Sequence, residues 1–407
     1  MGLVRNRVLL LLLATGVAAA SGLAFLTLAP NRLVAGTGIS LAQVVNAGEG
    51  FFPAFALAAT LVPALLLGAG VLMRPTRATQ LWVAVTATWL LAGLTWVAAE
   101  HAARLAFIPA AAAGNAAPGI PGIARTSFGG AFWILAALAW LAASDAIGRL
   151  GLKAGWRLAV NAAVALPVVA MIGAGALDQL SLLREYANRK DVFDAAVLRH
   201  AQLVLASLAP ALAIGVPLGI ASARHGKRMR RLRPALFAAL NIVQTIPSIA
   251  LFGLLMAPLA LLAASVPALA AWGIKGIGLA PAVIALALYA LLPVVRSTAA
   301  GLNQVPRPVI DAARGMGLSP RQIFWQVELP LALPIFLAGL RVATVQIIGL
   351  AVVAALIGAG GFGAIMFQGL SGGALDLVLL GVAPVAAMAV LADAMLKTFA
   401  LSLAHEF

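Results

Sequence analysis

The residues of this chain that could do chemistry are few and far apart. The twelve acidic residues lie mostly at the ends of apolar segments, and no two carboxylates are placed for general acid–base catalysis. The absence of cysteine excludes disulfides and thiolate metal sites. We therefore expect no catalytic site, no metal site and no enzyme activity. The four histidines fall in different segments, and no two share a helix face: His101, His200, His225 and His405.

Glycine-rich segments offer no nucleotide site either. The chain lacks the G-x-x-x-x-G-K-[ST] phosphate loop. Gly358, Gly360 and Gly363 fit the spacing G-x-G-x-x-G, with Gly361 at a variable position, but this pattern binds dinucleotides only between a strand and a helix. Here it follows a long apolar segment. We therefore expect a flexible gate or hinge at the outer mouth of a membrane helix, and no cofactor bound by this chain.

Polar residues inside apolar segments are the next candidates. Such residues are costly in a membrane and often mark a translocation path. They can equally join helices by hydrogen bonds worth about 0.6–2 kcal/mol each, and the sequence leaves both interpretations open. Thr344 lies near Arg341 in one apolar segment, and Asp393 in the last apolar segment is a further candidate. The residues that we expect to line a path are Asn241, Gln244, Thr245, Pro247, Ser248, Tyr289 and Gln346.

A longer polar stretch, residues 304–330, interrupts the apolar sequence and is called the elbow below. It begins around Pro306 and Pro308, and it ends at Pro330, where another apolar segment starts. Two short helices fit between these prolines. Pro308 suits the start of the first helix, where its missing N–H costs nothing.

Local signals within the elbow define both helices. Gly315 and Gly317 can adopt the left-handed conformation that ends a helix. Ser319, Pro320 and Gln322 then have the spacing of a capping box at the start of the second helix. Charged residues on one side and apolar residues on the other predict a docking surface. An ordinary loop between membrane helices is the alternative.

The composition requires a membrane environment for these elements. The chain has 407 residues, of which 63% are hydrophobic and 10% charged, whereas soluble domains carry about 25% charged residues. A spanning helix needs about 20 apolar residues. The continuous apolar segments predict an all-α integral membrane protein of about ten helices rather than a barrel. These segments lie at about 8–29, 52–73, 80–99, 131–147, 158–177, 201–222, 235–256, 277–295, 331–357 and 377–396.

The basic residues give the expected topology. If both termini are cytoplasmic and the chain alternates sides, roughly two-thirds of the 27 basic residues lie inside. This explains the net charge of +15 without nucleic acid, and it places the elbow in the cytoplasm. Segment 1–29 is too long for a typical signal peptide, so we expect an uncleaved first span. Segment 257–277 contains two prolines, which favours a re-entrant or external piece.

The polar stretch 178–200 divides the chain. We expect an accessory membrane region of about five spans at 1–177, an external connecting segment at 178–200, and a second five-helix region at 201–407. The second region contains nearly all the candidate residues, including the elbow.

The elbow resembles the conserved loop of bacterial ABC importer permeases, E-A-A-x3-G-x9-I-x-L-P. Its spacing matches throughout, with Asp311 in place of Glu and Val327 in place of Ile. Segments 243–253, 313–317 and 355–363 are similar to the permeases for glycine betaine, choline and related osmoprotectants. The resemblance covers about residues 195–407, and the first five spans look like an extended N-terminal subgroup. The resemblance implies that a set of elbow residues couples the permease to a partner ATPase. These residues are Asp311, Ala312, Ala313, Gly315, Gly317, Val327, Leu329 and Pro330.

This resemblance implies a type I importer core without covalent chemistry. ATP and magnesium would be bound by separate ATPase subunits, which dock on the elbow. Because one chain supplies one elbow, a second permease chain is implied, identical or paralogous. A periplasmic or lipid-anchored binding protein would deliver the solute to the bacterial inner membrane. Permeases for another small solute, such as an amino acid, remain an alternative, and an ion-coupled secondary transporter is a further one.

Overall fold

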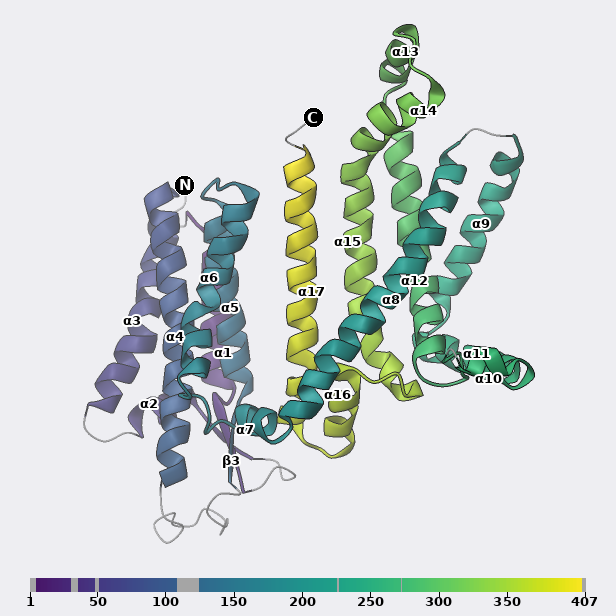
Figure 1. Cartoon of the computed structure of the whole chain (residues 1–407). Coiled ribbons are helices and arrows are strands. Elements are labelled where there is room, and N and C mark those ends of the chain that lie inside the picture. The colour runs from purple at the N-terminus through teal and green to yellow at the C-terminus, as the bar shows by residue number, and fades with distance from the viewer. Residues whose placement is uncertain are drawn as a thin grey trace. The chain divides into compact units, whose positions relative to one another are not determined.

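The computed structural model describes residues 5–30, 36–47, 51–107, 124–224, 227–271 and 273–404. The chain forms two compact units. Unit 1 comprises residues 1–188 and 372–376, and unit 2 comprises residues 189–371 and 377–407. Figure 1 shows the helices of both units. The expected all-α membrane architecture is confirmed, because nine helices of the described residues are long and apolar enough to cross a membrane.

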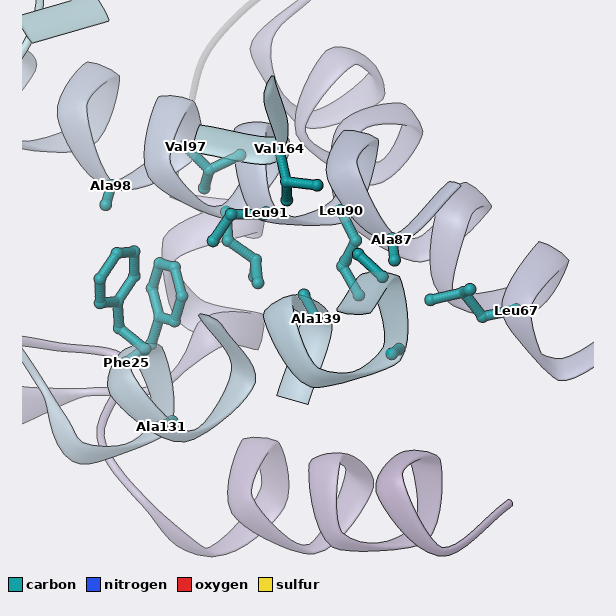
Figure 2. Close-up of a cluster of buried hydrophobic side chains, with 14 of the residues drawn as sticks. Phe25, Leu67, Ala87, Leu90, Leu91, Val97, Ala98, Ala131, Ala139 and Val164 are labelled. Carbon is teal, nitrogen blue, oxygen red and sulfur yellow. The ribbon is translucent and has the colours of Figure 1, made fainter. Parts of the chain in front are cut away.

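Unit 1 is a helical bundle with an aliphatic core. Leucine, valine and alanine side chains of α3, α4, α5 and α6 fill this core together with Phe25 (Figure 2). Gly93 of α4 lies so close to α3 that an added Cβ would be 1.9 Å from the carbonyl oxygen of Ala59. Its helices are α1 (Arg7–Gly22), α2 (Leu41–Asn46), α3 (Phe52–Leu72), α4 (Arg77–Phe107), α5 (Gly130–Gly148), α6 (Ala154–Gly173) and α7 (Ser181–Asn188).

A small antiparallel sheet in unit 1 was not expected. Its order is β2 (Thr37–Ile39), β1 (Leu26–Ala29), β3 (Arg125–Phe128). Because β1 is a strand, the expected first span at 8–29 is wrong at its C-terminal end: α1 stops at Gly22. A helix of 16 residues is about 24 Å long, shorter than the roughly 30 Å of a bilayer core. Pairing with strands distant in sequence outweighs helix formation for these few residues.

Charged side chains collect beside β3. Arg125 lies 3.7 Å from the buried carboxylate of Glu185 in α7. Arg184 donates hydrogen bonds to the carbonyl of Ala124 and to Gln179. Burial, and then the nearby charge of Arg125, lowers the pKa of the Arg184 guanidinium. These contacts join α7 to the sheet and form no site of their own.

Unit 2 is built around α12, which packs along both α8 and α15 (Figure 1). Glycines permit the close approach: a Cβ on Gly219 would lie 2.5 Å from Thr298, and one on Gly339 would lie 2.1 Å from Ser297. Its helices are α8 (Lys190–Ala223), α9 (Lys227–Thr245), α10 (Ser248–Ser265), α11 (Pro267–Ala271), α12 (Leu279–Asn303), α13 (Arg307–Gly315), α14 (Pro320–Ile323), a π-helix (Phe324–Glu328), α15 (Leu329–Val353), a 3-10 helix (Ala354–Ile357), α16 (Phe362–Ser371) and α17 (Leu375–Ala404).

The expected span at 235–256 is wrong as a single helix. The chain breaks at Ile246 and Pro247, so that α9 ends and α10 begins within the apolar segment. Pro247 supplies no N–H and caps α10 in an extended conformation. Figure 1 shows α10 and α11 turned across the direction of α8 and α12. The two prolines of segment 257–277 fall within α10 and at the start of α11.

Candidate functional site

The elbow folds as its local signals predict. Ser319 and Gln322 form the expected capping box: the Ser319 hydroxyl accepts from the Gln322 N–H at 3.4 Å, and the Gln322 side chain accepts from the Ser319 N–H at 2.8 Å. Gly317 has φ of +84°, and the N–H of Leu318 closes the end of α13 on the carbonyl of Ala313 at 3.2 Å. Gly315 is instead the last residue of α13, and its φ is not positive.

The surface of the elbow mixes charge with apolar area. Asp311 and Arg314 form an exposed ion pair at 3.2 Å. Met316 is 73% exposed and Trp325 is 65% exposed. Ala313 and Ile323 point inward and are buried, whereas Ala312 is exposed. Exposed aromatic, methionine and arginine side chains are the residues that interfaces between proteins favour. The elbow therefore has the character of a protein docking surface.

Within the elbow, a π-helix that was not expected from the sequence joins α14 to α15. Val327 lies within it, and Leu329 and Pro330 open α15 directly afterwards; all three are half-buried. Arg224 at the end of α8 lies 3.6 Å from Glu328 and stacks its guanidinium over Phe324 at 5.3 Å. These contacts tie the base of the elbow to α8.

Three of the predicted path residues meet between α9, α12 and α15. The Gln346 side chain donates to Gln244 at 3.3 Å. Gln244 donates in turn to the backbone carbonyl of Tyr289, whose hydroxyl donates to the carbonyl of Ile246. The last contact satisfies a carbonyl at the break between α9 and α10. This group, Gln244, Tyr289 and Gln346, is called the amide cluster below.

The other predicted path residues stand apart from the amide cluster. Asn241 accepts from Arg296 at 2.7 Å. Thr245 is exposed, and its hydroxyl bonds to the carbonyl of Ile242 in its own helix. Pro247 caps α10, and Ser248 is the first residue of that helix. These four residues define the broken segment rather than a shared pocket.

An ion pair crosses from α15 to α17. Arg341 donates from Nε at 2.8 Å and from Nη2 at 2.6 Å to the same oxygen of Asp393. Arg341 lies halfway along α15. The sequence marked both residues as polar positions without indicating that they pair.

Residues 358–363, called the glycine segment below, lie at the end of α15 opposite to α13 and α14 (Figure 1). Gly358, Gly360 and Gly361 have φ values of +77°, +81° and +78°. Gly363 differs: its φ is not positive, but an added Cβ would lie 1.9 Å from the carbonyl oxygen of Val352. All four positions therefore require glycine, for two different reasons.

A cavity of about 490 Å³ lies in unit 1 and is separate from these groups. It is bounded mainly by aliphatic side chains of α1, α2, α3, α4 and α5, and Asn46 of α2 also lines it. The hydroxyls of Ser21 and Thr60 at its wall bond to carbonyls of their own helices. It therefore presents almost no polar group to a ligand.

The four histidines are spread over different parts of the chain. His101 belongs to unit 1 and His200 to unit 2, whereas His225 and His405 lie outside the described residues. Within the described residues, no three histidine or acidic side chains are grouped as metal ligands. His200 instead contacts the glycine segment, as described below.

Comparison with known proteins covers both units. Residues 5–183 match the model of the N-terminal domain of ABC transporter permease YehY, and residues 215–404 match the model of the binding-protein-dependent transport system inner membrane component. Osmoprotectant import permease protein OsmW of Salmonella typhimurium is 38% identical over 48% of this chain and 84% of its own length.

Two further relatives differ in the solutes that their names state. The glycine betaine/carnitine/choline permease OpuCD of Bacillus subtilis is 35% identical over 48% of this chain and 77% of its own length. The ergothioneine transport permease/ergothioneine binding protein EgtU of Helicobacter pylori is 37% identical over 46% of this chain and 30% of its own length.

Proposed function

The chain belongs to the binding-protein-dependent permease family of ATP-binding-cassette importers, and from that premise we propose that it imports osmoprotectants such as glycine betaine, choline or related quaternary ammonium solutes. It is a multi-pass membrane transport subunit. The observation that carries the solute class is the similarity to OsmW and OpuCD, whose names state such solutes and of which this chain covers most of the length.

The elbow is the proposed docking site for the ATPase. ATP and magnesium are bound within the partner ATPase, and this chain performs no catalysis. The exposed Met316 and Asp311, the buried Ala313, and the turn at Gly317 support this role. Contacts of Arg224 with Phe324 and Glu328 connect the docking surface to α8, so that movement of the ATPase reaches the membrane helices.

The remaining partners and the location follow from the same family. One elbow per chain implies a second permease chain, and a periplasmic or lipid-anchored binding protein delivers the solute. We place the protein in the bacterial inner membrane with both termini in the cytoplasm. Residues 1–177 form the accessory region, 178–200 the external connection and 201–407 the core with its coupling loop at 304–330; the two separate family matches support this division.

The amide cluster is the proposed polar part of the translocation path, and the glycine segment is the proposed outer gate. The three side chains of the amide cluster are uncharged, which suits a quaternary ammonium group, since this group repels cations and offers no N–H donor. The helices would then rock between inward-facing and outward-facing states around the cluster.

The first prediction concerns the solute. Labelled glycine betaine is expected to enter cells that lack other osmolyte importers only when this chain and its ATPase are both present. The measurement is initial uptake with and without each subunit. Persistent uptake without an ATPase would show an ion-coupled transporter, and uptake of an amino acid or ergothioneine in preference to betaine would reassign the solute.

The second prediction concerns the amide cluster. Gln346→Leu removes the hydrogen bond to Gln244 and leaves its half-buried oxygen unpaired. A lost hydrogen bond costs about 1 kcal/mol, so we expect the apparent affinity for the solute to fall about fivefold at unchanged protein level. Concentration-dependent uptake provides the measurement.

A substitution in the same helix controls for packing effects. Thr344→Val keeps the side-chain shape, and the Thr344 hydroxyl bonds only to the carbonyl of Leu340 in its own helix. We expect nearly normal transport for this variant. Equal losses in both variants would contradict a path role for Gln346.

A further inference from the structure

Two adjacent residues of α8 contact the glycine segment, and neither contact was expected from the sequence. Arg199 donates from Nε to the carbonyl of Ala359 at 2.8 Å. The aliphatic part of the same side chain covers Gly360, where an added Cβ would be 3.2 Å from Cγ of Arg199. The backbone of this segment is therefore fixed by α8 rather than only by its own helices.

His200 is fully buried beside the same segment. Its Nε2 lies 3.1 Å from the carbonyl of Ile348. Because a carbonyl can only accept, Nε2 carries the hydrogen, and Nδ1 of the neutral ring is left as an acceptor. Nδ1 is buried without a hydrogen-bond partner, and a Cβ on Gly361 would lie 3.1 Å from it.

Backbone N–H groups follow directly after Gly361, whose Cβ position is beside this unpaired acceptor, and the N–H of Ala364 already bonds to the carbonyl of Gly361. Helix α16 begins at Phe362, and the first N–H groups of a helix have no acceptor within it. The rings of His200 and Phe362 are 5.5 Å apart, and Phe193 packs on Phe362 from the same helix as His200. The N–H groups of Phe362 and Gly363 are therefore the donors that a shift of the segment would bring to Nδ1.

We propose that Arg199 and His200 form a two-position latch on the glycine segment. In the present position, Arg199 holds Ala359 and His200 donates to Ile348. In the other position, the segment has moved and Nδ1 of His200 accepts from the first turn of α16. Both are positioning residues, and the proposal rests on the proposed function, in which this segment is the outer gate.

The absence of cysteine from the chain permits a direct test. Ala359→Cys places a thiol at a fully buried position, and Leu356→Cys places one at a side chain that is 51% exposed. The protein, assembled with its ATPase in lipid nanodiscs, is treated at rest with a membrane-impermeant maleimide. Adding Arg199→Ala is expected to accelerate labelling at position 359 about tenfold, since hydrogen bonds from charged donors are among the stronger ones, without changing position 356.

Substitutions of His200 separate the two positions of the latch. Gln retains a donor in the place of Nε2, whereas Asn retains an acceptor in the place of Nδ1. His200→Gln should label slowly at rest but transport poorly. His200→Asn should label faster at rest and retain more transport. A purely structural role would affect both variants alike, and that result would overturn the latch.

Removing a different positive charge from α8 controls for the loss of charge in Arg199→Ala. Lys190→Ala removes an exposed positive charge from α8 and should leave labelling at position 359 unchanged. If Arg199→Ala labels no faster than Lys190→Ala, Arg199 does not hold the segment. Resting labelling requires neither ATP nor solute, so a wrong transport assignment would leave this result intact.

Discussion

Gly317→Val is expected to leave the protein in the membrane but to reduce ATP-driven uptake by about tenfold or more. An added Cβ at this position meets nothing within 4 Å, so the effect is conformational. A left-handed conformation costs a residue with a side chain about 1–2 kcal/mol, and a β-branched one more. The turn between α13 and α14 would therefore rearrange and misplace the docking surface. Uptake and co-purification of the ATPase measure the two consequences.

Gly315 provides a matched control two residues away. It also has open space around its Cβ position, but its φ is not positive. Gly315→Val should therefore leave the turn intact and lose less uptake and ATPase binding than Gly317→Val. If both valine variants bind the ATPase as the unmodified protein does, the elbow is not the coupling site.

Asp393→Leu is expected to lower the stability of unit 2 strongly. The substitution leaves Arg341 without its carboxylate halfway along α15. An unpaired arginine at the centre of a membrane helix costs about 2.5–3.5 kcal/mol. Thermal unfolding of the purified protein in nanodiscs, together with its yield from membranes, should show the loss.

Removing both charges should recover most of this stability. Replacing a whole ion pair by apolar residues is often neutral, whereas removing one partner is not. The double variant Arg341→Leu/Asp393→Leu is therefore expected to unfold near the temperature of the unmodified protein. A double variant as unstable as Asp393→Leu would mean that the pair does not act as a unit.

Local signals account for what the sequence predicted well. The capping box of Ser319 and Gln322 and the turn at Gly317 depend on side chains within a few residues, so the sequence states them almost completely. Apolar segment length gave the helical membrane fold for the same reason. The amide cluster is a partial success: polarity marked Gln244 and Gln346, but only packing of α9 against α12 and α15 brings them together.

Non-local contacts account for what was missed. Strand β1 exists because it pairs with β3 about a hundred residues later in the sequence, and no local pattern indicates that partner. Arg199 and His200 resemble ordinary helix residues until the glycine segment, 160 residues downstream of Arg199 at Ala359, folds against them. The break after Thr245 was obscured because apolar residues continue on both sides of Pro247.

The π-helix at Phe324–Glu328 affects the direction in which the two short helices of the elbow, α13 and α14, point. Its turn holds more residues than an α-helical turn, and each residue of an α-helix advances the chain by about 100° around the axis. The number of residues between α14 and α15 therefore sets the direction, around the axis of α15, in which α13 and α14 project. If one residue were added to or removed from the π-helix, the same docking surface would be rotated about this axis and would face a different partner surface.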